Sequence, residues 1–144
     1  MPILNYTTKI AAAKTTAEIQ TNLAKHGAKA ILTEYDDAGN AEALSFKIVT
    51  RQQGELGFRL PINTEAIQRI LIKQNVDRRF REYDHAVKVA WRIVKDWVEA
   101  QMAILETEMV EMEQIFLPYM VTPGGQTLYS VMRDRGFYLE EGRG

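Results

Sequence analysis

The chain has 144 residues, of which 46% are hydrophobic and 26% are charged, and its formal net charge is −1. These values are typical of a single globular domain with a sizeable core, and they exclude an overall field that would attract nucleic acid or a membrane. The absence of cysteine excludes disulfides, thiolate zinc sites and a cysteine nucleophile, and it fits a reducing cytoplasm. We expect no export, because the N-terminus lacks a basic region followed by a long apolar run, and no membrane span, because no stretch reaches about 18 apolar residues.

The first part of the chain predicts a short helix followed by three strands. Residues 15–18 have the form of a capping box, and the helix that follows should end near His26. Residues 28–35 favour a strand, and residues 41–50 and 56–60 alternate between apolar and polar side chains. Because turn-forming residues separate these runs, we expect an antiparallel three-stranded meander with one hydrophobic face.

Helices should supply the cover that this face needs. One helix is expected to begin at Asn63 or Thr64, and a last short helix is expected at residues 126–133, after a turn. The predicted fold class is therefore α+β, in a single domain. This domain has three successive parts, namely an α-β-β-β-α layer, a long helix, and a C-terminal turn with a short helix and a tail, at residues 1–76, 77–117 and 118–144.

The most regular pattern predicts one long amphipathic helix at about residues 84–117. Its apolar side chains recur every three or four residues, at Val87, Trp91, Val94, Val98, Met102, Leu105, Met109, Met112 and Phe116. A helix of this length would measure roughly 50 Å, which exceeds the width of a compact domain of this size. We therefore expect part of the helix to protrude or to meet another chain.

The charges along this helix run in the unfavourable direction. Six basic residues lie between positions 78 and 95, and six acidic residues lie between positions 96 and 113, whereas the helix dipole favours the opposite order. An antiparallel second copy would compensate, and this predicts a twofold homodimer. The alternative is a charged, solvated face on a helix that packs against its own domain. The predicted interface with a second copy, or with a host or phage protein, comprises Trp97, Val98, Met102, Leu105, Met109, Met112 and Phe116.

A basic cluster surrounds the start of the same helix. Arginine forks suit phosphate oxygens, and Phe80 and Tyr83, which are interleaved with the arginines, could stack on a base. The alternative is that the arginines meet the carboxylates of a neighbouring chain. The candidate residues for binding a phosphate or a partner are Lys73, Arg78, Arg79, Arg81, Lys88 and Arg92.

No pattern in the sequence predicts catalysis. The two histidines, His26 and His85, have no positioned catalytic partner nearby in the sequence. The seven-residue spacing of Glu99, Glu106 and Glu113 is more typical of a charged helix edge than of a metal site. Glycine-rich phosphate loops are absent as well. We therefore expect no enzyme activity, no cofactor and no metal.

Four segments carry a resemblance to a family: AKHGAKAI, GFRLP, VAWRIVKDWVEAQMA and FLPYMVT. With them, the chain resembles small uncharacterised proteins encoded in phages and prophages of Gram-positive bacteria, over most of its length. This resemblance implies expression in the cytoplasm of a bacterial host, among phage genes for replication or for disabling host functions. Two hypotheses follow. The first is a non-enzymatic accessory protein that sequesters or inhibits a host macromolecule through a homodimeric helical surface, with components of host defence among the candidate targets. The alternative is a protein that binds nucleic acid or a nucleotide through its basic cluster.

Overall fold

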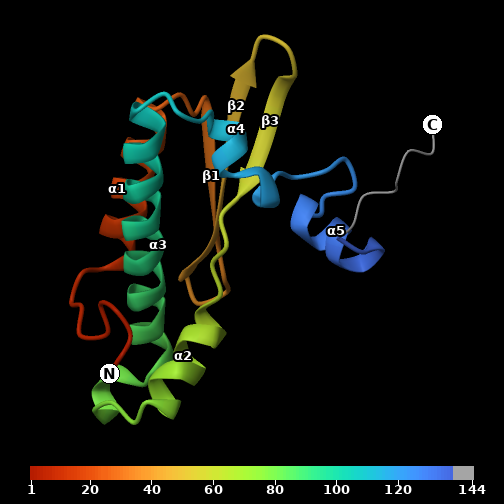
Figure 1. Ribbon diagram of the computed structural model, residues 1–144. Coiled ribbons are helices and arrows are strands. Elements are labelled where there is room, and N and C mark those ends of the chain that lie inside the picture. The colour runs from red at the N-terminus through yellow and green to blue at the C-terminus, as the bar shows by residue number, and fades with distance from the viewer. Residues whose placement is uncertain (138–144) are drawn as a thin grey trace.

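The computed structural model describes residues 1–137 and confirms the predicted α+β class (Figure 1). Residues 138–144 of the predicted tail lie outside the described part. Along the chain, the elements are α1 (Ala12–Lys25), β1 (Ala30–Tyr35), β2 (Ala41–Thr50), β3 (Gly54–Arg59), α2 (Thr64–Lys73), the 3₁₀ turn η1 (Arg78–Phe80), α3 (Tyr83–Glu106), α4 (Met112–Ile115), the 3₁₀ turn η2 (Leu117–Tyr119) and α5 (Leu128–Arg135).

The three strands form the predicted antiparallel meander in the order β1-β2-β3. In the register of the sheet, Phe46 of β2 lies opposite Ile31 of β1 and Phe58 of β3. Leu44, Phe46 and Ile48 are buried, as their alternation predicts. Helices α1 and α3 lie side by side and pack against this face of the sheet (Figure 1).

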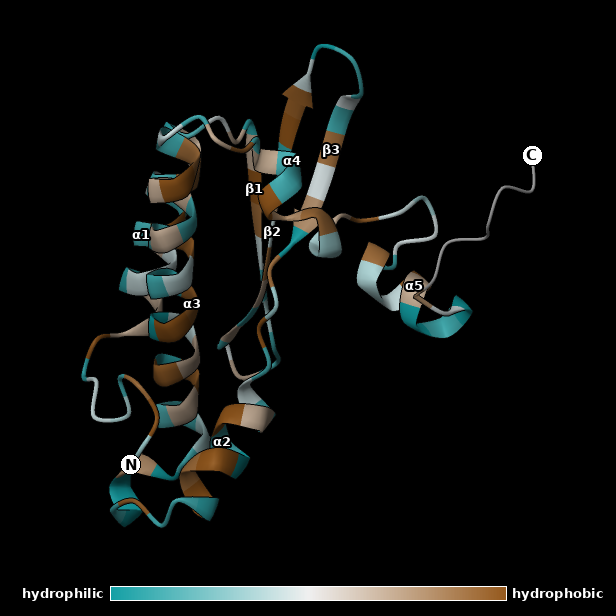
Figure 2. Cartoon of the chain, in the orientation of Figure 1, coloured by the Kyte–Doolittle hydropathy of each residue, from teal (hydrophilic) through white to brown (hydrophobic). Residues whose placement is uncertain are grey.

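The core is aromatic where the long helix crosses the sheet. Trp91 is fully buried, and its indole nitrogen donates a hydrogen bond to the Ala41 carbonyl at 2.9 Å. The ring of Phe116 lies 5.2 Å from that of Phe46 and 5.5 Å from that of Trp97, centroid to centroid and edge to face. Figure 2 shows hydrophobic residues along β2 and along α3, the two elements that meet here.

Helix α1 begins earlier than the capping-box pattern predicts. It starts at Ala12, so Thr15 lies inside the helix and does not cap it. The buried hydroxyls of Thr15 and Thr16 instead donate hydrogen bonds to backbone carbonyls in the preceding turn. The end of α1 agrees with the prediction, because Gly27 follows with the positive φ of 110° that glycine adopts readily.

The predicted long helix at residues 84–117 is in fact two helices. Helix α3 ends at Glu106 after 24 residues, a length of about 36 Å. The Thr107 hydroxyl donates a hydrogen bond to the Ile104 carbonyl and accepts one from the Met109 amide, so it captures backbone groups at the helix end. Glu108 then has a left-handed φ of 62°, which turns the chain out of the helix and leads to α4.

Because of this break, most residues of the predicted dimer or partner interface lie in the core of their own chain. Val98, Met102, Met112 and Phe116 are at most 6% exposed and belong to the core of their own chain, so the interface prediction is wrong for these four residues. Trp97 and Leu105 are partly buried against the same core. Met109 alone of the seven is largely exposed, at 73%. The apolar stripe therefore covers its own sheet, because α4 folds back where a straight helix would have projected.

Candidate anion-binding site

A cleft of about 720 Å³ opens where the N-terminal segment, the connection between α2 and α3, and the first turns of α3 meet. These segments lie together at the end of the molecule that holds α2 (Figure 1). Three cationic side chains line the cleft: Lys9, Arg79 and Lys88. We call this site the basic cleft. The sequence predicted two of these cations, Arg79 and Lys88, whereas Lys9 was missed.

A small hydrophobic cluster lies next to the basic cleft. Leu71 of α2, Val76 of the connection and Ala86 of α3 are buried together, apart from the main core. Tyr6 and Phe80 pack on this cluster and also line the cleft. The cluster thus fixes the relative positions of three segments that are distant in sequence, which is what brings their cations together.

Hydrogen bonds hold the N-terminal segment across the start of α3. The His85 ring nitrogen Nε2 lies 2.5 Å from the Tyr6 carbonyl oxygen. Closer to the N-terminus, the Ile3 amide donates to the Gln74 side chain at 2.9 Å. These contacts attach the N-terminal segment to the end of α2 and the start of α3, and Lys9 lies three residues beyond Tyr6 in this segment. They also give His85 a structural partner.

The aromatic rings of the cleft are already in contact with other protein groups. Phe80 lies edge to face with Tyr6, at 5.7 Å between centroids, and its ring is 5.0 Å from that of His85. The Arg79 guanidinium carbon lies 4.6 Å from the centroid of the Phe80 ring. The Phe80 ring thus already has three protein neighbours, which leaves less of its surface for a base. This arrangement favours contacts with phosphate over recognition of bases.

The balance of charge in the basic cleft favours an anion. Asp77 is the one carboxylate among the described residues that line it. Asp77 accepts a hydrogen bond from the Arg79 amide, and its Oδ1 lies 3.6 Å from Arg79 Nε. Both side chains of this pair are mostly exposed, so the pairing is weak and leaves the guanidinium available.

The other residues of the predicted basic cluster do not line the basic cleft. Lys73, at the end of α2, and Arg78, in η1, are exposed and are neighbours in sequence of residues that line the cleft. Arg81 is half-buried, and its Nε is enclosed without a hydrogen-bond partner. Arg92 forms an ion pair with Glu18 of α1. The predicted cluster is therefore divided by the fold.

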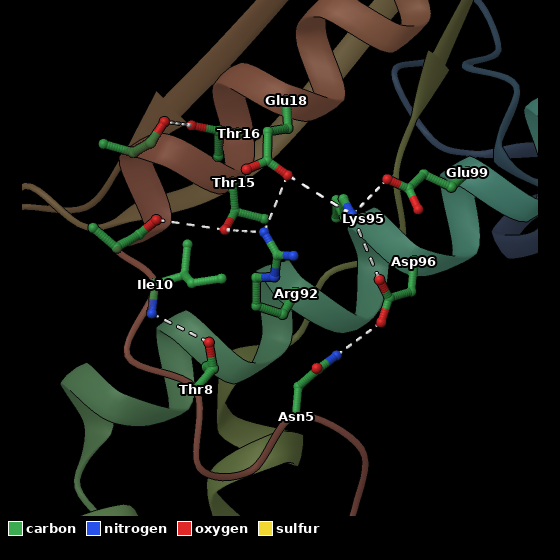
Figure 3. A network of polar contacts seen from close by, with 12 residues as sticks. Asn5, Thr8, Ile10, Thr15, Thr16, Glu18, Arg92, Lys95, Asp96 and Glu99 are labelled. Carbon is green, nitrogen blue, oxygen red and sulfur yellow. Dashed lines mark hydrogen bonds and ion pairs between the residues drawn. The ribbon is translucent and has the colours of Figure 1, made fainter.

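Arg92 belongs to a network between α1 and α3 (Figure 3). Its guanidinium donates to the Glu18 carboxylate at 3.1 Å, and Lys95 lies 3.8 Å from the same carboxylate. Lys95 also lies 2.5 Å from Glu99, one turn further along α3. Both basic side chains are at most 15% exposed. Within one chain, Glu18 thus supplies part of the charge compensation that the sequence analysis assigned to a second copy.

His26 and Glu106 form another bridge between α1 and α3, at the opposite end from the basic cleft. The Nδ1 of His26 lies 2.7 Å from the Asn22 carbonyl, and its Nε2 lies 2.8 Å from a Glu106 oxygen. The Asn22 carbonyl and then the Glu106 carboxylate raise the pKa of His26 above its ordinary value of 6.5. Because both ring nitrogens face acceptors, the imidazolium satisfies both contacts.

Across residues 1–137, no group of three or more histidine, aspartate or glutamate side chains is arranged to hold an ion. The helix edge with Glu99, Glu106 and Glu113 is divided, since Glu99 pairs with Lys95 and Glu106 with His26.

Comparisons with known proteins add no further assignment. No family model matches the chain, and no curated protein or solved structure matches it. The resemblance to phage-encoded proteins therefore stays a prediction. None of the helices in residues 1–137 combines the length and hydrophobicity that crossing a membrane requires.

Proposed function

We propose that this protein is a non-enzymatic binding protein that holds nucleic-acid phosphates in the basic cleft. One observation carries the proposal: Lys9, Arg79 and Lys88 come from three separate segments and line one cleft that contains a single carboxylate among its described residues. Arginine and lysine both bind phosphate, arginine through paired donors and lysine as a point charge.

The structure of the cleft supports phosphate contacts of low sequence specificity. Phe80 packs edge to face with Tyr6, tilted against His85 and beneath the Arg79 guanidinium, so a base that stacked on its ring would compete with these contacts. Contacts to phosphates position a protein on nucleic acid without reading its sequence. We therefore expect weak, salt-dependent binding, with a dissociation constant of roughly 10⁻⁴ to 10⁻⁶ M, as is usual for non-specific complexes.

This proposal follows the second of the two hypotheses from the sequence. The first hypothesis needs an exposed apolar seam on the long helix, and most of that seam is buried in the core of its own chain. If the resemblance to phage and prophage proteins is correct, the basic cleft would act on nucleic acid inside a bacterial host. The proposal itself depends on the cleft and not on that resemblance.

The test is the salt dependence of binding to a short, fluorescently labelled DNA duplex, measured by anisotropy. Three phosphate contacts predict that the logarithm of the association constant falls with the logarithm of salt concentration, with a slope of roughly −2.7. The triple variant K9A/R79A/K88A should lose this binding.

A matched control keeps the change in net charge constant. Lys25, Lys29 and Arg51 are exposed and lie outside the basic cleft. The variant K25A/K29A/R51A should therefore bind almost as tightly as the unmodified chain. Equal losses in both triple variants would reduce the effect to net charge, and unchanged binding in K9A/R79A/K88A would exclude the basic cleft.

A further inference from the structure

Helix α2 carries two exposed cations, and a third follows in η1 beside the basic cleft. Arg69 and Lys73 are four residues apart in α2, so their side chains project from the same side of the helix, with Cβ atoms about 5–6 Å apart. Arg78 lies between Asp77 and Arg79, which both line the cleft. All three cations are exposed. We call Arg69, Lys73 and Arg78 the basic ridge.

No carboxylate pairs with the basic ridge in the described part of the chain, residues 1–137. Between positions 66 and 81 the sequence has five basic residues and one acid, Asp77. Together with the three cations that line the cleft, the three of the ridge bring six to the end of the molecule that holds α2 (Figure 1). Exposed cations without partners attract the phosphates of nucleic acid.

Two exposed isoleucines flank the cations of α2. Ile70 is 40% exposed and Ile72 is 53% exposed, and their side chains emerge on the two sides of the buried Leu71. Figure 2 shows hydrophobic residues on this helix. The faces of unpaired bases are available for packing against side chains, whereas a duplex keeps them stacked inside and presents phosphates and base edges. The combination of exposed cations and isoleucines therefore fits a single strand better than a duplex.

The basic cleft also has the size for one strand. Its volume of about 720 Å³ lies in the range of sites that hold a small molecule, roughly 300–1,000 Å³. The hydroxyls of Thr7 and Thr8 and the amides of Gln74 and Asn75 line it, and such groups can hydrogen-bond to a sugar or to a base edge. A duplex, whose major groove alone is about 12 Å wide, can bring only one backbone to the mouth of the cleft.

We propose that the preferred ligand of the basic cleft is single-stranded nucleic acid, whose backbone leaves the cleft over η1 and crosses α2 along the basic ridge. Its phosphates would contact the three cations of the ridge, and its unpaired bases would pack on Ile70 and Ile72. This inference rests on the proposed function, because it names the kind of nucleic acid that the same cleft holds. A duplex would keep the three contacts in the cleft and miss those of the ridge.

Anisotropy with a labelled thymidine oligonucleotide of about 12 nucleotides tests the proposal on the full chain. Six phosphate contacts to a single strand predict a slope of roughly −4.2 in the salt dependence, and the variant R69A/K73A/R78A should reduce it to roughly −2.1. This variant should bind the strand roughly tenfold more weakly at low salt. The control K25A/K29A/R51A removes the same charge outside both sites and should keep the steeper slope. The two variants should bind the duplex equally well.

A second variant, I70Q/I72Q, separates the packing of bases from the phosphate contacts. Glutamine has a high helix propensity and both positions are exposed, so circular dichroism should stay unchanged. We expect about threefold weaker binding of the strand, with the same salt slope and the same affinity for the duplex.

The two probes distinguish failure of this inference from failure of the proposed function. A duplex that binds the unmodified chain as tightly as the strand would overturn the inference and leave the proposed function standing. A folded R69A/K73A/R78A variant that keeps the steeper slope would do the same. If neither probe bound the unmodified chain, both proposals would be wrong.

Discussion

The two ends of α3 differ in the segments that pack around them and in how accessible their charged side chains are. At the start of the helix, the N-terminal segment and η1 gather cations around an open cleft. At its other end, Glu106 pairs with His26, and the chain turns at Glu108 so that α4 returns to the sheet. One amphipathic pattern in the sequence thus covers two different environments. At the start of α3 the cations remain accessible, whereas after its end α4 packs on the hydrophobic core.

The largest effect on stability should come from removing the Phe116 side chain, which packs in the core beyond the end of α3. This side chain is fully buried against Phe46, Phe58 and Trp97. Phe116→Ala should lower the free energy of unfolding by about 3–5 kcal/mol, measured by urea denaturation, because it leaves a cavity in the core. The exposed Met109, from the same predicted stripe, provides the control, since Met109→Ala should change stability by no more than about 0.5 kcal/mol. Similar effects of the two substitutions would mean that the stripe is not folded back.

A second experiment compares two arginines that the sequence placed in one cluster. Arg92→Ala should lower the free energy of unfolding by about 1–3 kcal/mol, because it removes the charged hydrogen bond to Glu18, and it should leave DNA binding unchanged. Arg79 is exposed, so Arg79→Ala should weaken DNA binding with little loss of stability. Urea denaturation and anisotropy on both variants separate the two roles. The comparison fails if Arg92→Ala weakens binding as much as Arg79→Ala does.

The break after α3 can be sharpened at Glu108. Its left-handed backbone costs an ordinary residue about 1–2 kcal/mol, a cost that glycine avoids. Part of this gain is lost to the greater freedom of glycine in the unfolded chain, so Glu108→Gly should raise the unfolding free energy by up to about 1 kcal/mol. The exposed Ala103 lies within α3, and Ala103→Gly should instead lower it by about 1 kcal/mol. A loss of stability in Glu108→Gly would argue for a continuous helix.

The smallest effect concerns the pH dependence of the His26 bridge. Because the pKa of His26 is raised in the folded state, the bridge stabilises the fold fully below pH 6.5, and this contribution is lost as the pH rises through the raised pKa. We expect the difference in unfolding free energy between the unmodified chain and His26→Gln to stay below about 1 kcal/mol, since Glu106 is largely exposed. Urea denaturation across this pH range measures it, and a difference that grows with pH would contradict the assignment.

The sheet and most helix positions could be predicted because they depend on local patterns. Alternation in β2 identifies the buried face, and Asn63 caps α2 as expected, accepting a hydrogen bond from the Ala66 amide. The end of α3 could not be found in this way. Met112 and Phe116 keep the four-residue spacing after the break, because α4 covers the same sheet, and no proline or glycine marks the turn.

The candidate site was only half predictable for a different reason. Arg79 and Lys88 lie in one basic run, which composition alone reveals, but Lys9 is 70 residues from Arg79 in sequence. Its position depends on the packing of Tyr6 against the small core and on the bond from His85, neither of which has a local pattern. Arg92 belongs to the same basic run, and only the packing of α1 on α3 removes it from the site.

The central claim is that the open, basic end of α3 is the functional end. The most direct measurement is a titration of the ¹⁵N-labelled chain with a short DNA duplex, followed through its backbone amide resonances. We expect shifts in the N-terminal segment, in the α2–α3 connection and in the first turns of α3, with none in α4. Shifts confined to α4 and the end of α3, or no shifts at low salt, would contradict the claim.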